Sequence, residues 1–355
     1  MPRIERANER IGESRGRKPT MVSRLLVTGG TGFIGSNFLR YVLSLDDTIT
    51  ALNLDKLGYG SNPSNLRDLE NRKGYKFIKG NITNPPLVKR LCKDVDAVVN
   101  FAAETHVDRS ISTPKVFFEN NTVGVLALLD ACRGNDLAFL QVSTDEVYGS
   151  VQANVAFKEK DKLDPSSPYA ASKAAADMLV QAYRKTYGLR TYVTRCTNNF
   201  GPYQFPEKFI PKTIITALLG LRVPIYGSGK QIRDWLHVTD HCEAIYKVLR
   251  EGEPGVTYNI SGGNQVENLA VASSILKLLG KEESLIQHVS DRPGHDFQYA
   301  LDSSQIRAQL GWEPKRTFPD ALRETVDWYV KNQAWWKLLV TDPKILSSAP
   351  WKERW

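Results

Sequence analysis

Two side chains in the segment YAASK carry the first chemical signal of this sequence. Tyr169 and Lys173 stand four residues apart, a spacing that places both on one face of a helix. Ser166 or Ser167, followed by Pro168, supplies the start signals for that helix. An ammonium group near a phenol lowers the pKa of the phenol, so Tyr169 is a candidate general base near neutral pH. Such a pair arises by chance on many helices. It indicates a catalytic site only when a nucleotide-binding loop lies beside it.

A second candidate group is Thr144-Asp145-Glu146, at the end of the fifth expected strand. Ligands of parallel sheets bind beyond the carboxyl ends of the strands. Thr144 is suited to hydrogen-bond a substrate hydroxyl. Neighbouring carboxyl groups in different environments can act as a protonated acid and an ionised base. An isolated Asp-Glu pair is usually a solvated loop, but the preceding apolar run and the proximity of Tyr169 in sequence favour a functional site.

The loop TGGTGFIG, residues 28–35, follows the first expected strand and opens a helix. It fits both GxGxxG and GxxGxxG, in which glycines let the backbone turn tightly and approach a pyrophosphate at the helix N-terminus. Asp55 ends the next strand, 20 residues after Gly35. An acid there accepts hydrogen bonds from an adenosine ribose and repels a 2′-phosphate. The sequence therefore predicts NAD rather than NADP, and the positive nicotinamide would further lower the Tyr169 pKa.

Short aliphatic runs alternate with helix-compatible stretches around these motifs. The runs of strand length are Arg24–Val27, Ile49–Leu54, Tyr75–Ile78, Ala97–Phe101, Ala138–Val142 and Thr191–Thr194. The helical stretches include Ile34–Leu45, Pro114–Cys132 and Pro168–Tyr187. This alternation indicates βαβ units and an α/β fold with a Rossmann-type, doubly wound parallel sheet.

The sequence changes character after Asn199, where Gly, Pro and aromatic residues become frequent before an amphipathic stretch at Pro319–Lys331. We therefore expect a smaller C-terminal substrate lobe interleaved with the first domain. The expected division is a flexible basic extension at 1–20, an NAD-binding domain at 21–199, a mostly substrate-binding lobe at 200–340 and a C-terminal tail at 341–355.

Composition excludes several classes of protein. With 41% hydrophobic and 24% charged residues in a chain of 355, disorder throughout is excluded. No apolar stretch approaches the ~18 uncharged residues of a membrane span, and no secretory signal is seen. The four cysteines lie far apart without a CxxC pair, which argues against a metal site or a disulfide framework and favours a reducing cytoplasm.

The net charge of +8 raises the alternative of nucleic-acid binding. Residues 1–20 alone contribute +3, from six basic and three acidic residues. The remaining charge is spread thinly, without a basic run. A mild positive field that attracts an anionic small molecule is the interpretation we prefer, and no nucleic-acid partner is expected.

The chain resembles the dTDP-glucose 4,6-dehydratases of the extended short-chain dehydrogenase/reductase superfamily from about Arg24 to Tyr329. The motifs that carry the resemblance are TGGTGFIG, NLDKL, FAAETHVDRSI, STDEVYG, PYAASKAAAD, NNFGPYQFPEKFIP, PIYGSGKQIRDWLHVTDH, YNISGGN and DRPGHD. Thr-Asp-Glu discriminates within the superfamily, because related epimerases carry small residues in place of Asp145 and decarboxylases commonly have Ser-Glu there.

The resemblance implies a set of NAD contacts, with Tyr169 and Lys173 as the base and its partner. Asn81 and Asn120 depart from the Asp and Thr that are usual at those positions. The implied cofactor-binding residues are Gly29, Gly32, Phe33, Ile34, Gly35, Asp55, Lys56, Leu57, Asn81, Ile82, Ala102, Ala103, Glu104, Asn120, Tyr169, Lys173 and Asn199.

The resemblance also implies a sugar-nucleotide site, in which Arg233 and Arg292 are suited to hold a pyrophosphate and Tyr226 to pack against the base. No role is implied for His237, His241 or His288, which we interpret as structural. The implied substrate residues are Thr105, Thr144, Asn198, Lys208, Phe209, Ile210, Pro224, Ile225, Tyr226, Arg233, Asn268, Arg292 and His295.

The activity that the resemblance implies is NAD-dependent loss of water from dTDP-D-glucose by a homodimeric enzyme. Its expected catalytic residues are Thr144, Asp145, Glu146, Tyr169 and Lys173. Asp145 would be the acid, shielded from water and kept protonated by burial and by the charge of Glu146. The alternatives are a 4-epimerase or decarboxylase of the same superfamily and a non-catalytic NAD sensor. Thymidine and uridine substrates are not separated by the sequence, since one methyl group distinguishes them.

Overall fold

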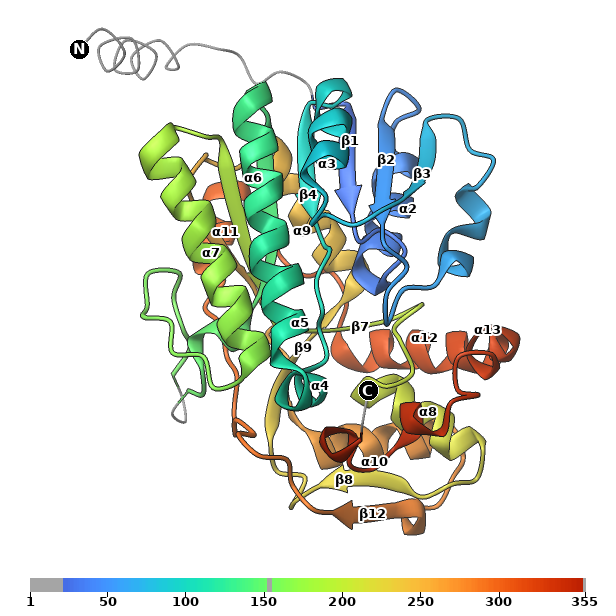
Figure 1. Ribbon diagram of the computed structural model, residues 1–355. Coiled ribbons are helices and arrows are strands. Elements are labelled where there is room, and N and C mark those ends of the chain that lie inside the picture. The colour runs from blue at the N-terminus through green and yellow to red at the C-terminus, as the bar shows by residue number, and fades with distance from the viewer. Residues whose placement is uncertain (1–21, 152–154, 354–355) are drawn as a thin grey trace, which may run out of the picture.

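The computed structural model describes residues 22–151 and 155–353. The extension expected at residues 1–20 lies outside them. Figure 1 shows a large α/β body with a smaller lobe beneath it. The body is built on a parallel sheet of seven strands in the order β10-β6-β5-β4-β1-β2-β3. These strands are β1 (Arg24–Thr28), β2 (Thr50–Asp55), β3 (Tyr75–Lys79), β4 (Ala97–Asn100), β5 (Ala138–Thr144), β6 (Thr191–Cys196) and β10 (Thr257–Ile260).

Helices cover both faces of this sheet, as the doubly wound fold requires. On one face lie α2 (Phe33–Leu45), α9 (Val238–Glu251) and α11 (Ser304–Leu310). On the other lie α3 (Pro85–Leu91), α6 (Gly124–Asn135) and α7 (Pro168–Tyr187). Leu25 and Val27 of β1 face the first layer, whereas Leu26 between them faces the second. This is why the strands are apolar on both faces rather than alternating.

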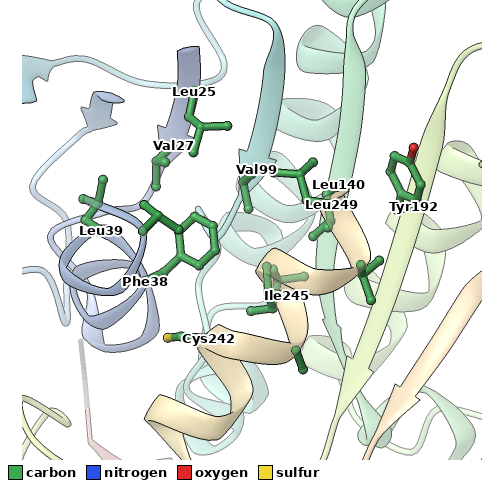
Figure 2. Close-up of a cluster of buried hydrophobic side chains, with 14 of the residues drawn as sticks. Leu25, Val27, Phe38, Leu39, Val99, Leu140, Tyr192, Cys242, Ile245 and Leu249 are labelled. Carbon is green, nitrogen blue, oxygen red and sulfur yellow. The ribbon is translucent and has the colours of Figure 1, made fainter. Parts of the chain in front are cut away.

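Figure 2 shows the core on the first face of the sheet. Phe38 and Leu39 of α2 and Ile245 and Leu249 of α9 pack against it, all at most 3% exposed. Because α9 follows residue 199 in sequence, residues of the second half of the chain complete the core of the first domain. Residues that are distant in sequence, in α2 and α9, therefore form one core.

The smaller lobe has its own sheets and core. A three-stranded sheet joins β7 (Asn198–Phe200), β9 (Ile232–His237) and β11 (Gln265–Glu267), and a pair joins β8 (Val223–Tyr226) to β12 (Ile286–Val289). Its helices are α8 (Phe209–Leu218), α10 (Asn268–Leu278), α12 (Phe318–Lys331) and α13 (Gln333–Lys337). Phe200, Trp235 and Phe318 lie in its core.

Two local features bear on the site. Helices α4 (Val107–Ser112) and α5 (Pro114–Phe118) precede α6, and a π-helical turn, η4 (Glu119–Val123), joins α5 to α6. Turns of this kind often occur at functional sites. Near the end of the described residues lie the short helices η7 (Pro343–Leu346) and η8 (Pro350–Lys352). In residues 22–151 and 155–353, no helix is long and apolar enough to cross a membrane.

Candidate active site

A cavity of about 270 Å³ opens beyond the carboxyl ends of the central strands. The ends of β1, β2, β4, β5 and β6 all contribute to its wall, together with the first turn of α2 and the start of α7. The loop between β7 and α8 closes it from the smaller lobe. Both chemical signals of the sequence, the YAASK pair and the Asp-Glu pair, therefore meet the glycine loop at one place.

The glycine loop forms a cradle that side chains would fill. Gly29 has a φ of +72°, and a Cβ there would lie 2.6 Å from the backbone nitrogen of Ala102. A Cβ on Gly35 would lie 2.4 Å from the carbonyl oxygen of Gly29. Gly32 caps α2 without any side-chain hydrogen bond, which leaves the first turn of the helix open to the cavity. The arrangement fits the pyrophosphate of a dinucleotide.

Asp55 lies at the end of β2 in the wall of this cavity. Its Oδ2 accepts from the Thr31 backbone nitrogen (3.1 Å) and its Oδ1 from the Leu57 backbone nitrogen (2.8 Å). Leu57 itself, with a φ of 59°, is absent from the lining residues. The backbone of Leu57 orients Asp55, and the contact with the cofactor that was expected of Leu57 stays a prediction. Asn81 and Ile82 do line the cavity.

Lys56 also lines the cavity, but its ammonium group is already paired. It donates to Glu104 Oε1 at 2.7 Å and to Asn120 Oδ1 at 2.9 Å. Asn120 reaches this position from the π-helical turn η4. The three side chains are thus linked by hydrogen bonds in the cavity wall. Asn120 departs from the pattern that the resemblance implies, but its side chain has a defined partner in Lys56.

Tyr169 and Lys173 lie in the first turns of α7, whose N-cap is Ser167. Tyr169 is 7% exposed. The Lys173 ammonium donates to the Val142 carbonyl oxygen on β5 at 2.7 Å. Burial, followed by the charge of Glu146, raises the pKa of Tyr169 well above its ordinary value. The protein groups therefore do not lower this pKa by themselves. The lowering expected from Lys173 together with the positive nicotinamide would have to come from the nicotinamide.

Asp145 and Glu146 follow β5 in the short helix η5 (Asp145–Tyr148), with Thr144 as its N-cap. Asp145 is 3% exposed. Its Oδ1 accepts from Thr144 Oγ1 at 3.1 Å, while its Oδ2 has no hydrogen-bond partner among the described residues. Burial and then the charge of Glu146 raise the Asp145 pKa well above its ordinary value. The direction agrees with the protonated acid expected from the sequence.

Glu146 stands in a different environment. Burial raises its pKa, but three cations, Arg292, Lys208 and Arg233, oppose that rise. Arg233 also opposes the rise at Asp145, where its effect is smaller than those of burial and Glu146. The pKa of both carboxyl groups is raised, but that of Asp145 stands well above its ordinary value, whereas three cations limit the rise at Glu146. This difference favours Asp145 as the protonated acid and Glu146 as the base.

The expected substrate residues fall into two groups. Thr105, Thr144, Asn198 and Lys208 line the cavity, and Lys208 Nζ donates to the Thr105 carbonyl oxygen at 2.8 Å. The others lie outside its lining. Ile210 and Ile225 are each 1% exposed in the cores of the smaller lobe. Their side chains pack the lobe, so any substrate contact would have to come from their backbones.

The remaining expected residues surround a second polar cluster next to Glu146. Asp108 of α4 accepts from Arg292 (2.8 Å) through Oδ1 and from Tyr226 (3.2 Å) through Oδ2. Arg233 is held by the carbonyl oxygens of Ile232, Asp296 and Phe297. His295 lies beside Tyr226, with ring centroids 6.2 Å apart, and is hydrogen-bonded to Asp291. Pro224 lies on β8, Asn268 begins α10, and Phe209 stacks on Trp235 in the smaller lobe.

Sequence reasoning gave no role to several residues of the cavity wall. Glu207 accepts from the Tyr59 hydroxyl and lies 3.1 Å from His106 Nε2. Burial raises the Glu207 pKa to about 7. His106 lies in the motif FAAETHVDRSI and Glu207 in NNFGPYQFPEKFIP. Their positions within these motifs could have marked them as site residues. His241, interpreted as structural, is buried and its Nδ1 lies 2.8 Å from Oδ1 of Asn199 in the cavity wall.

Comparisons with known proteins agree with this geometry. The family model described as GDP-mannose 4,6 dehydratase matches residues 26–325. A dTDP-glucose 4,6-dehydratase of Xanthomonas campestris is 48% identical over 331 residues, covering 87% of this chain and 94% of that protein. The chain belongs to the dTDP-glucose 4,6-dehydratase family. The corresponding enzyme of Streptomyces niveus is 47% identical, covering 89% and 95%.

Solved structures of this family extend the comparison. A dTDP-glucose 4,6-dehydratase from Bacillus anthracis in complex with NAD superposes with a TM-score of 0.84 at 47% identity, covering 89% of this chain and 99% of that one. The enzyme of Streptomyces venezuelae with NAD and TYD bound gives a TM-score of 0.87 at 43% identity, with the same coverage. A UDP-glucose 4-epimerase of Thermus thermophilus is more distant, at 30% identity and a TM-score of 0.80, covering 87% and 99%.

Proposed function

We propose that this protein catalyses the NAD-dependent conversion of dTDP-D-glucose to dTDP-4-dehydro-6-deoxy-D-glucose and water. The observation that carries the proposal is the buried Asp145 beside Glu146, in a cavity that also holds Tyr169. An epimerase or a decarboxylase does not eliminate water, and so does not require a protonated carboxyl group at this position. Family membership supports the same reaction.

The first step requires a base at the C4 hydroxyl. Tyr169 takes that proton, with Thr144 as a hydrogen-bond partner of the hydroxyl and Lys173 as a nearby cation. When bound, NAD supplies the redox chemistry, accepting the C4 hydride and returning it to C6. The glycine cradle of Gly29, Gly32 and Gly35, together with Asp55, would hold its pyrophosphate and ribose.

The second step removes water across C5 and C6. The C4 ketone acidifies the C5 proton, which Glu146 removes, while Asp145 donates its proton to the departing C6 hydroxyl. Glu146 returns a proton to C5 when C6 is reduced. A proton passing from Tyr169 to Asp145 through solvent restores the starting state, so that sugar and enzyme both balance at the end of the cycle.

In this proposal the two parts of the fold bind different ligands. Residues 21–199 bind NAD, and the lobe formed mostly by residues 200–340 binds the sugar nucleotide. Lys208, Arg233 and Arg292 supply positive charge next to Glu146, where the substrate's diphosphate would lie.

The decisive experiment is incubation with dTDP-glucose and, separately, with UDP-glucose. A 4-keto sugar, detected by its alkali-induced absorbance, is expected with dTDP-glucose. Accumulation of the 4-epimer without a keto product would reject the dehydratase proposal in favour of the epimerase. Binding of NAD without turnover of either substrate would favour a sensor.

We further propose that the enzyme is a homodimer that pairs through α5, η4, α6 and α7. This surface exposes a set of large apolar side chains that a monomer would leave in water: Val116, Phe118, Val123, Leu126, Met178 and Tyr187. Light scattering should give twice the chain mass, and Val123→Lys should shift it toward the monomer. A monomeric wild-type protein would contradict the proposal.

We also propose a cytoplasmic location. All four cysteines are free and buried in the structure, as is usual for proteins of reducing compartments. The positive charge is assigned to anionic small molecules rather than to nucleic acid. At moderate salt, retention on DNA should be weak and nonspecific, whereas tight sequence-selective retention would contradict this assignment.

A further inference from the structure

The chain beyond α13 folds back onto the smaller lobe. Ile345 is 3% exposed, and Lys212 of α8 donates to the Ser347 carbonyl oxygen at 3.0 Å. Pro350 in η8 is also buried. Figure 1 shows this segment in dark red beside α8. The match to the family model ends at residue 325, so the family pattern assigns no function to these residues.

The folded segment brings one aromatic side chain to the second polar cluster. Helix η8 packs against α4, the helix that carries Asp108. Trp351 thereby meets Tyr226, with ring centroids 5.1 Å apart and planes at 88°. The Tyr226 hydroxyl donates to Asp108, which also pairs with Arg292 at 2.8 Å. A continuous set of contacts therefore runs from Trp351 to Arg292.

Arg292 connects this aromatic pair to the reacting groups. It acts electrostatically on Glu146, as do Lys208 and Arg233. A substrate whose sugar lies at Glu146 would place its diphosphate among these cations. The next part of such a substrate, a flat pyrimidine, would then lie on the far side of Arg292, at Tyr226 and Trp351.

We propose that Trp351 is a substrate-binding residue that forms, with Tyr226, the aromatic wall against which the nucleotide base packs. The inference rests on the proposed function, since it takes the substrate to be a nucleoside diphosphate sugar. An edge-to-face pair of rings offers one flat face to a ligand, and stacking of a base on an aromatic side chain is worth enough to alter affinity about tenfold. The C-terminal segment thus completes the substrate site.

The test compares Trp351→Ala, Trp351→Phe and a control, Leu338→Ala. Leu338 precedes the folded segment and is 76% exposed, so removing it changes apolar surface without touching the site. Thymidine diphosphate is the probe in calorimetry, with NAD binding measured in parallel. Steady-state kinetics with dTDP-glucose separates KM from kcat.

We expect Trp351→Ala to raise the Kd for thymidine diphosphate and the KM for dTDP-glucose by roughly tenfold, with kcat and NAD affinity unchanged. Trp351→Phe should restore most of the affinity, and Leu338→Ala should match the wild type. Unchanged affinity in Trp351→Ala, or failure of phenylalanine to restore it, overturns the role of Trp351. If the wild-type protein itself binds no thymidine diphosphate, the proposed function has failed instead.

Discussion

Replacing Asp145 by asparagine is expected to stabilise the protein while abolishing dehydration. The amide is almost the same size and keeps an acceptor for Thr144 Oγ1, which lies 3.1 Å from Asp145 Oδ1. The carboxyl group is 3% exposed, and burial and Glu146 raise its pKa well above the ordinary 3.8. We therefore expect the folded chain to keep a proton on Asp145 that the unfolded chain releases at neutral pH.

The magnitude follows from this difference in proton binding. Stability falls as pH rises above 3.8 and continues to fall until the pH reaches the folded-state pKa. If the folded-state carboxyl group is still protonated at pH 7, the protein loses about 1.4 kcal/mol of folding stability per pH unit over roughly three units. The total loss is on the order of 4 kcal/mol. Asparagine does not titrate and so causes no such loss. The stability gained by Asp145→Asn at pH 7 is therefore at most on the order of 4 kcal/mol.

The assay is denaturant unfolding of the wild type and Asp145→Asn at several pH values between about 5 and 7. The stability gap should widen by about 1.4 kcal/mol per pH unit. Asp327→Asn makes the same chemical change at an exposed position of α12 and should show no such trend. A gap that stays constant with pH would mean that Asp145 holds no extra proton when folded, and its role as the acid would be refuted.

Three further predictions concern the reaction and the chain start. Tyr169→Phe should slow single-turnover reduction of NAD by about 10²–10⁴-fold while leaving NAD affinity intact, and near-normal reduction would contradict its role as base. Glu146→Gln should still oxidise C4, so that the reduced cofactor accumulates, but should lose exchange of the C5 hydrogen with deuterated solvent. Asp145→Asn should retain this exchange, and the same exchange behaviour in both variants would undo the assignment. A protein beginning at Met21 should keep the activity and Tm of the full chain, and a large loss of either would show that residues 1–20 contribute.

Most of the central sheet was predictable because strands such as β4, β5 and β6 are buried on both faces. The edge strand β3 has no buried residue, and β10 was not among the predicted runs. An apolar run such as Ala138–Val142 has few alternatives to a central strand, and the structure extends it only to Thr144. The start of α7 was equally predictable, because serine is a favoured N-cap residue. Ser167 Oγ accepts from the Ala170 backbone nitrogen at 3.1 Å. In both cases the deciding interactions lie within a few residues of one another in sequence.

The unpredicted parts depend on partners that are distant in sequence. The raised pKa of Tyr169 comes from burial and from Glu146, neither of which the YAASK spacing reveals. Lys56 meets Glu104, which follows β4, and Asn120, which lies in η4, and both are far from Lys56 in sequence. The contact between Trp351 and Tyr226 follows from the packing of the last turns and has no local pattern in sequence.

The position of β10 has a consequence for how the protein is made. This strand pairs with β6 in the parallel sheet, joining Ile260 to Cys196, so the ribosome must add 64 further residues after Cys196 before the partner strand exists. At about 5–20 residues per second this leaves the edge of β6 uncovered for roughly 3–13 s. An open edge of that kind can pair with other chains. Nascent chains that pause between β6 and β10 should therefore depend on chaperones more than those that pause after Ile260.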